Sequence, residues 1–198
     1  MEIKDAYIIK NFMPYGYSHV VRSDLMSPDP GLSTWNWGAL PSADGRGSGL
    51  VSVNWYALPQ EHQTFWNPII HTAEKEIRNH INDETVRVVQ ARAVGMTAGM
   101  YGGKHVDEMS TLPCWIVLYY PQTLRDIDGG RTMVYDQQGN VLLNQTPEEN
   151  TCIIFKGDLV HEITPLTPHF YNQLRMSINL KLSVNDEKEI KPDGREYD

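Results

Sequence analysis

The sequence has few cysteines and no long apolar run. Cys114 and Cys152 are its two cysteines, and both stand in apolar surroundings. Two cysteines make no disulfide framework for a chain of this size, so we expect both to be buried free thiols. No stretch approaches the roughly 20 apolar residues of a membrane-spanning helix, and the acidic start MEIKD does not resemble a signal peptide. These absences predict a soluble, cytoplasmic chain with no membrane partner.

Basic residues are also fewer than acidic ones. The chain has 17 Lys and Arg residues against 25 Asp and Glu residues, which gives a formal net charge of −8. A molecule with this balance repels polyanions, so broad binding of nucleic acid is disfavoured. The length of 198 residues suits one domain with a single sizeable core. The sequence leaves the oligomeric state open.

One segment has the period of an α-helix. The residues at positions 69, 70, 73, 77 and 81 are Ile or Ala and fall on one helical face. Asn67 can cap the start, Pro68 suits the first helical position, and Asn82 follows the last apolar residue. We therefore expect one amphipathic helix, over 68–82, that packs against a sheet.

The rest of the chain is typical of a β-rich protein, because short runs of Val, Ile, Tyr and Trp alternate with Gly and Pro. The predicted strands cover 50–56, 86–94, 115–120, 131–135, 141–143, 152–155 and 174–182, with two short strands around His105 and Val160. The segment 115–120 is apolar throughout, as in a strand covered on both faces. From residue 86 onward these are about eight strands, and they predict a mainly β fold with a flanking helix, the double-stranded β-helix or jelly roll.

We expect a single domain over 1–198. In this interpretation 1–84 forms a supporting region, 85–182 forms the jelly-roll core, and 183–198 forms a charged tail. The segment 28–49 is poor in aliphatic residues and is predicted to be a long surface loop, of the kind that can act as a lid. Its Trp35 and Trp37 either anchor the loop to the core, which is the preferred interpretation, or touch a substrate.

Three residues form a candidate metal site. In His105-Val106-Asp107 an extended backbone sends the imidazole and the carboxylate to the same face. The pair alone does not identify a metal site, because the sequence contains 7 histidines and 25 acidic residues. However, His161 follows in another predicted strand, and two histidines with one aspartate form the facial triad that leaves positions open on Fe(II). A structural zinc site would favour thiolates.

The last predicted strand carries a polar face and an apolar face. Arg175, Ser177, Asn179 and Lys181 share the polar one. This face either lies in solvent or faces a wet interior, where the fork of Arg175 would match a carboxylate. The same Arg-x-Ser triplet occurs at 46–48, so the position of Arg175 after His161 is what distinguishes it.

These residues resemble a known family, the Fe(II)- and 2-oxoglutarate-dependent oxygenases, and within it the prolyl 4-hydroxylase-like branch. The resemblance covers 86–182, about half of the chain. The matching segments, in the family's order, are YGGKHVD at 101–107, WIVLYY at 115–120, DGGRT at 128–132, IFKGDLVHEITP at 154–165 and RMSIN at 175–179. Five segments in the right order are far more specific than any one of them.

The resemblance implies a role for each residue of the candidate site. His105, Asp107 and His161 would hold Fe(II). Arg175 would bind the distal carboxylate of 2-oxoglutarate, with help from Ser177. Dioxygen would be the second cosubstrate, and ascorbate is a further cofactor to consider.

Other residues have weaker counterparts in the family. Tyr120 would hydrogen-bond the same carboxylate, with Tyr119 pointing outward, although a shift of one residue would exchange the two. Tyr101 and Lys181 are expected as neighbours of the active site. Two features depart from the family: no tyrosine stands in 90–94, before the metal motif, and Arg131 replaces an acidic residue.

The implied reaction is hydroxylation of a C–H bond with release of succinate and carbon dioxide. A peptidyl side chain is the first expectation for the substrate, with proline the first guess. A small molecule is an alternative, and so is a methylated nucleic acid, because nucleic-acid demethylases also place a basic residue after the cosubstrate arginine, as Lys181 does. The net charge of −8 argues against nucleic acid. From another class, a non-catalytic jelly-roll binding module stays open.

Overall fold

The computed structural model describes residues 4–26, 38–40, 49–51, 60–107, 114–170 and 173–184. Most of the expected loop 28–49, including Trp35, Trp37 and the triplet at 46–48, lies outside these residues, as do 52–56 of one expected strand and nearly all of the expected tail. The described elements are β1 (Ala6–Lys10), α1 (Tyr17–Leu25), β2 (Gly38–Leu40), β3 (Gly49–Val51), α2 (Gln60–Ile81), β4 (Arg87–Met96), β5 (Gly102–His105), β6 (Cys114–Tyr120), β7 (Thr132–Tyr135), β8 (Val141–Gln145), β9 (Thr151–Lys156), β10 (His161–Ile163) and β11 (Arg175–Ser183), with short 3₁₀ turns at Asp126–Asp128 and Pro168–Phe170.

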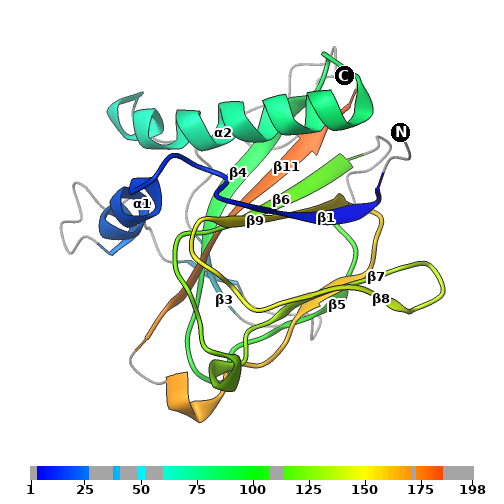
Figure 1. Ribbon diagram of the computed structural model, residues 1–198. Helices are drawn as coiled ribbons and strands as arrows, with labels where there is room; N and C mark the ends of the chain where they lie inside the picture. Colours follow the sequence, from blue (N-terminus) through cyan, green and yellow to red (C-terminus); the bar gives the residue numbers. More distant parts are fainter. Residues whose placement is uncertain are drawn as a thin grey trace.

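The strands form two antiparallel sheets that face each other (Figure 1). The larger sheet has seven strands in the order β1-β9-β6-β11-β4-β3-β2, and the smaller has four in the order β5-β10-β7-β8. All eight strands predicted from residue 86 onward are present. Most neighbouring strands, such as β1 and β9 or β5 and β10, come from distant parts of the chain, as in a jelly roll, so this fold prediction is confirmed.

The prediction of a single helix was wrong. Tyr17–Leu25 forms α1, in which Ser18, Val21 and Leu25 are buried. Its apolar stripe is only two turns long, which is too short to give a clear period in the sequence. The strand β1 was also missed; its five residues pair with β9 along the edge of the larger sheet.

The predicted helix 68–82 is real but begins earlier, at Gln60, so Pro68 lies inside α2 rather than at its start. An interior proline loses one backbone hydrogen bond and costs about 3 kcal/mol. The buried side chains on both sides of it, Trp66, Ile69 and Ile70, each stabilise the packed helix by roughly 1.5–3 kcal/mol. Burial therefore outweighs the local preference. The helix ends as expected, with Asn82 in the left-handed region at φ 55°.

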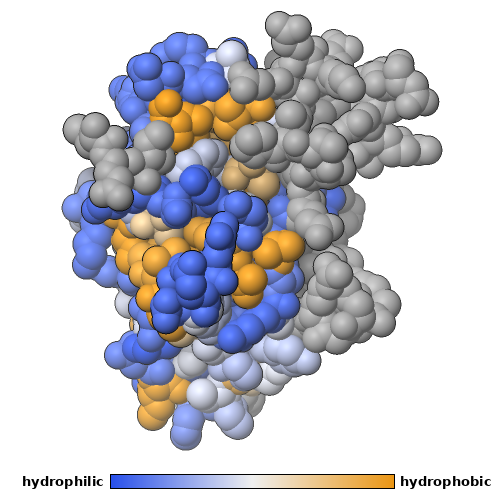
Figure 2. Space-filling model, turned by 90° about the vertical axis from the view of Figure 1, so that its right-hand side faces the viewer, coloured by the Kyte–Doolittle hydropathy of each residue, from blue (hydrophilic) through white to orange (hydrophobic). Residues whose placement is uncertain are grey.

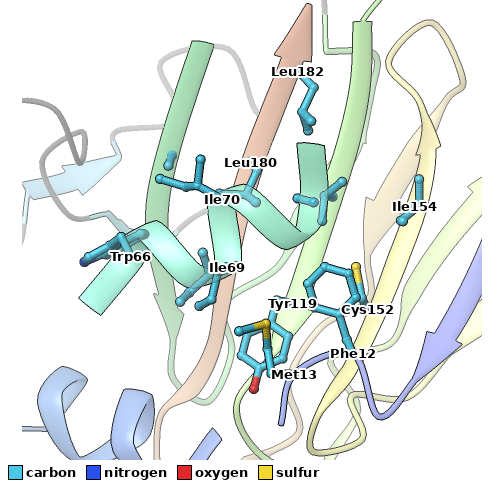
Figure 3. Close-up of a cluster of buried hydrophobic side chains, with 14 of the residues drawn as sticks. Phe12, Met13, Trp66, Ile69, Ile70, Tyr119, Cys152, Ile154, Leu180 and Leu182 are labelled. Carbon is cyan, nitrogen blue, oxygen red and sulfur yellow. The ribbon is translucent and has the colours of Figure 1, made fainter. Parts of the chain in front are cut away.

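Helix α2 covers the outer face of the larger sheet (Figures 1 and 3). Its buried Ile69, Ile70 and Ile77 belong to the same core cluster as Leu180 and Leu182 of β11. On β6, alternate residues divide between two cores. Trp115, Val117 and Tyr119 join the cluster under α2, and Ile116, Leu118 and Tyr120 join a second cluster between the sheets. The strand is thus covered on both faces, as its unbroken apolar run predicted.

Cys114 and Cys152 are buried and free, as expected. In the described part of the chain no helix is long and apolar enough to cross a membrane. Figure 2 shows groups of hydrophobic side chains separated by hydrophilic ones on one face of the molecule. Exposed apolar residues include Val141 and Leu142 of the edge strand β8.

Candidate functional site

The smaller sheet brings the three expected metal ligands together. His161, at the start of β10, is the direct partner of His105, at the end of β5, and Asp107 follows two residues later. One ligand atom from each of the three residues lies within 4.8 Å of the others. Residues 54 positions apart in the sequence therefore meet because β5 and β10 are adjacent and antiparallel.

Backbone carbonyl groups orient both imidazoles. Nδ1 of His105 lies 2.6 Å from the carbonyl oxygen of Gly103, and Nδ1 of His161 lies 3.0 Å from that of Leu159. A carbonyl oxygen only accepts, so each Nδ1 is the donor of its hydrogen bond. Burial lowers the pKa of His161, which favours its neutral form. Imidazoles held through Nδ1 in this way present Nε2 to a metal ion.

Asp107 is held from three sides. Its backbone N–H donates to the carbonyl of Gly157 at 3.0 Å. One carboxylate oxygen, Oδ2, lies 3.5 Å from Nε2 of His161. The other, Oδ1, accepts a hydrogen bond from Nζ of Lys181 at 2.7 Å. One oxygen thus faces the histidines while an ammonium group fixes the other.

The donor set fits an iron ion. Imidazole nitrogen and carboxylate oxygen are ligands that Fe(II) takes, and three of them on one side leave positions open for other molecules. The aromatic ring of Phe155, 4.8 Å from that of His161, covers the buried side of the site. These residues could hold Fe(II).

A second polar site surrounds Arg175 at the start of β11. Its guanidinium is completely buried. Nε donates to the carbonyl of Gly130 at 2.9 Å, and Nη2 donates to Oγ1 of Thr132 at 3.1 Å. Thr132 also hydrogen-bonds the hydroxyl of Tyr120 at 2.6 Å, and the Arg175 Cζ atom lies 5.4 Å from the Tyr120 ring centre.

Arg175 has no acidic partner among the described residues. Burial lowers the pKa of its guanidinium, which shows how unfavourable the charge is in this environment. A buried cation without an anion lowers the free energy of unfolding by roughly several kcal/mol. Such an arrangement could bind a carboxylate.

The polar face of β11 points into the space between the sheets rather than into solvent. On the opposite face of the strand, Met176, Ile178, Leu180 and Leu182 are buried under α2. Ser177 is buried as well, but its hydroxyl donates to Oδ1 of Asn179. The wet-interior interpretation of this face agrees with the burial of Arg175 and Ser177.

The two adjacent tyrosines lie on opposite faces of β6. Tyr120 is buried on the side of Arg175. Tyr119 points away from the site, but it is also buried, with its ring centre 6.0 Å from that of Phe12. The expected neighbour Tyr101 is 38% exposed. Arg131, the departure noted above, pairs with Asp126 outside the site.

Thr132 is a site residue that the sequence analysis missed. It is fully buried and links Arg175 to Tyr120. In β7 it shares one face with the buried Val134, and Met133 between them is only partly buried. The paired glycines before Thr132 are a sequence signal for close packing against Arg175, because a Cβ atom on Gly130 would lie 3.0 Å from the Arg175 side chain.

No family model and no curated protein matches this sequence. Solved structures do match. An oxidoreductase of the 2OG-Fe(II) oxygenase family from Burkholderia pseudomallei has a TM-score of 0.69 at 14% identity, with 90% of this chain and 85% of that chain covered. A prolyl hydroxylase from Trichoplax adhaerens, in complex with a peptide fragment of hypoxia inducible factor, has a TM-score of 0.68 at 16% identity, covering 92% and 84%. The epimerase SnoN from nogalamycin biosynthesis has a TM-score of 0.66 at 9% identity, covering 91% and 78%. The chain thus shares its jelly-roll fold with these proteins.

Proposed function

We propose that this chain is an Fe(II)- and 2-oxoglutarate-dependent oxygenase. One observation carries the proposal: two imidazoles and a carboxylate of the smaller sheet converge between the sheets, where the larger sheet contributes a fully buried arginine that lacks an acidic partner in the described chain. A metal site alone would fit many proteins. The added receptor for a carboxylate is what a non-catalytic binding module would not need.

His105 and His161 would hold the iron through Nε2, and Asp107 through the oxygen that Lys181 leaves free. Iron bound there, with 2-oxoglutarate and dioxygen, would supply the chemistry that hydroxylates a C–H bond and yields succinate and carbon dioxide. The carbonyl groups of Gly103 and Leu159 keep both imidazole rings in place. The protein therefore contributes a fixed ligand set.

Arg175 would select the cosubstrate. Its fork is aligned by Gly130 and Thr132, and a carboxylate is the planar anion that matches it. The hydroxyl of Tyr120, next to Thr132, would donate a further hydrogen bond to the same carboxylate. Apolar residues around this pair, among them Leu118 and Val134, keep water out and strengthen the charge interaction.

For the primary substrate we propose a peptidyl side chain, with proline first. The sequence segments resemble the prolyl hydroxylases, and one structurally similar protein was solved with a bound peptide. A small molecule is the alternative, because the similar SnoN belongs to a biosynthetic pathway for nogalamycin. Nucleic acid is not proposed, because the net charge is −8 and Lys181 is already engaged by Asp107.

An anaerobic titration tests the reaction class. With Fe(II) and 2-oxoglutarate both bound, the full-length chain should show a weak charge-transfer absorption band at about 500 nm. His161→Ala should remove the band by removing a ligand, and Glu162→Gln, a neighbouring change outside the ligand set, should keep it. A colourless wild-type complex that consumes no 2-oxoglutarate in air would refute the proposal. Mass spectrometry of peptides and metabolites that gain one oxygen would then identify the substrate.

A further inference from the structure

A third cationic side chain lies on the inner wall of the larger sheet, besides Arg175 and Lys181. Arg92 of β4 is the direct partner of Asn179 in β11. Its neighbours Ala91 and Ala93 are fully buried in the core under α2. Because side chains alternate along a strand, Arg92 points to the opposite face, into the space between the sheets.

Arg92 has an unsatisfied polar atom. Its Nε is buried and finds no hydrogen-bond partner among the described residues. The other such atoms in the described chain are the hydroxyls of Tyr7, Tyr119 and Ser183, which are neutral. A guanidinium is always charged, so burying one of its donors without an acceptor is unfavourable. The side chain of Arg92, which is partly buried as a whole, therefore lacks an acceptor for Nε among the described residues.

The strand register places Arg92 closer to Lys181 than to Arg175 along this wall. The facing pairs on this wall run from Met96 and Arg175 at one end to Gln90 and Lys181 at the other. The pair of Arg92 and Asn179 is four residues from Arg175 but only two from Lys181, which contacts Asp107. At about 3.4 Å per residue, Arg92 lies toward the metal end of the wall.

The charges on this wall are unbalanced. Of the three cations, Lys181 alone has an acidic partner among the described residues. The distal carboxylate of 2-oxoglutarate would balance Arg175, which leaves Arg92 without a partner. We infer that Arg92 binds an anionic group of the primary substrate, a carboxylate or a phosphate, close to the reacting carbon. This inference rests on the proposed function and narrows the substrate to an acidic molecule or a peptide with an acidic residue.

Anion titration by isothermal calorimetry tests the inference. The full-length chain is held without oxygen with Fe(II) and saturating 2-oxoglutarate, so that the site of Arg175 is filled. Acetate and methylphosphonate are then added separately, and the tighter binder identifies the kind of anion. Wild type should bind one of them, and Arg92→Gln should weaken this binding about tenfold or more, because a charge-assisted hydrogen bond is lost. Arg92→Lys should restore part of it.

Arg87→Gln is the matched control. Arg87 is an exposed arginine of the same strand and donates to the backbone carbonyls of Glu84 and Val86. Its replacement should leave anion binding unchanged. Equal anion binding by wild type and both Arg92 variants overturns the inference. So does a loss confined to 2-oxoglutarate binding, which would assign Arg92 to the cosubstrate. Failure of the proposed function can be told apart from failure of this inference. If the proposed function is wrong, wild type shows no charge-transfer band with Fe(II) and 2-oxoglutarate.

Discussion

Lys181 Nζ lies 2.7 Å from Oδ1 of Asp107, although the two residues are 74 positions apart in the sequence. The contact joins the last strand of the larger sheet to the loop that follows β5 of the smaller sheet. Both side chains are mostly buried, with 24% and 21% of their surfaces exposed. An ion pair in this setting can fix the direction of a metal ligand.

Lys181→Met should therefore weaken metal binding. The carboxylate of Asp107 would lose the partner that holds one oxygen away from the histidines, and such changes typically reduce metal affinity by about tenfold or more. An anaerobic Fe(II) titration measures the effect. Lys156→Met, which breaks an exposed ion pair with Asp5, is the control and should leave the affinity unchanged. Tighter binding by Lys181→Met would mean that the ammonium competes with the metal ion instead.

Arg175→Lys should separate the cosubstrate from the metal. A lysine keeps the positive charge but loses the planar fork and the hydrogen bond to Gly130, so the affinity for 2-oxoglutarate should fall by about tenfold or more. The affinity for Fe(II) should stay at the wild-type level. Both constants come from the charge-transfer band and a direct iron titration. If 2-oxoglutarate bound as tightly to the variant, Arg175 would not be its receptor.

Metal should stabilise the folded chain through the same three residues. A ligand at about 100 times its Kd stabilises the native state by about 2.7 kcal/mol. For a chain of this length that corresponds to a rise in Tm of about 5–10 °C. Differential scanning calorimetry with and without Mn(II), a redox-stable substitute for Fe(II), measures the shift. His161→Ala should lose it, and an unchanged shift in that variant would place the metal elsewhere.

Gly130→Ala should disturb the site through crowding. Gly130 has a φ of 66°, and an added Cβ would lie 2.7 Å from Leu166 Cδ2 and 3.0 Å from Arg175 Cδ. We expect a loss of about 1–3 kcal/mol in the free energy of unfolding, together with weaker 2-oxoglutarate binding. The control is Gly139→Ala, where φ is 85° but nothing lies within 4 Å of the new atom.

Gly139→Ala should carry the backbone strain alone, about 1 kcal/mol, without an effect on ligand binding. Urea denaturation and the 2-oxoglutarate titration measure both quantities for each variant. Equal losses in the two variants would show that the close packing at Gly130 does not matter.

Much of the fold could be predicted because most strands after residue 86, apart from the short β5 and β10, carry their own alternating or continuous apolar run. The elements that were missed or misplaced depend on tertiary contacts. The five residues of β1 are a strand because β9 pairs with them, and α2 extends past Pro68 because the sheet buries Trp66. Local sequence preference does not contain that information.

The candidate site, like the fold, has residues that the sequence predicts and residues whose positions depend on tertiary contacts. The spacing of His105 and Asp107 and the order of the later motifs pointed to the metal ligands and to Arg175. The positions of Thr132 and Arg92 depend on which strands are neighbours and on their register, as in the pairing of Arg92 with Asn179. A single sequence does not specify these pairings, so neither residue could be placed in advance.

The order of strands in the larger sheet determines when this sheet can be completed during synthesis of the chain. Its central strand, β11, is the last to be made, and it separates β6 from β4. Until the ribosome has released residue 183, β4 and β6 each present an unpaired edge, the kind of surface on which nascent chains associate. The arginine at the start of β11 arrives with that final insertion. A chain cut short before it would therefore lack both its structural centre and its carboxylate receptor.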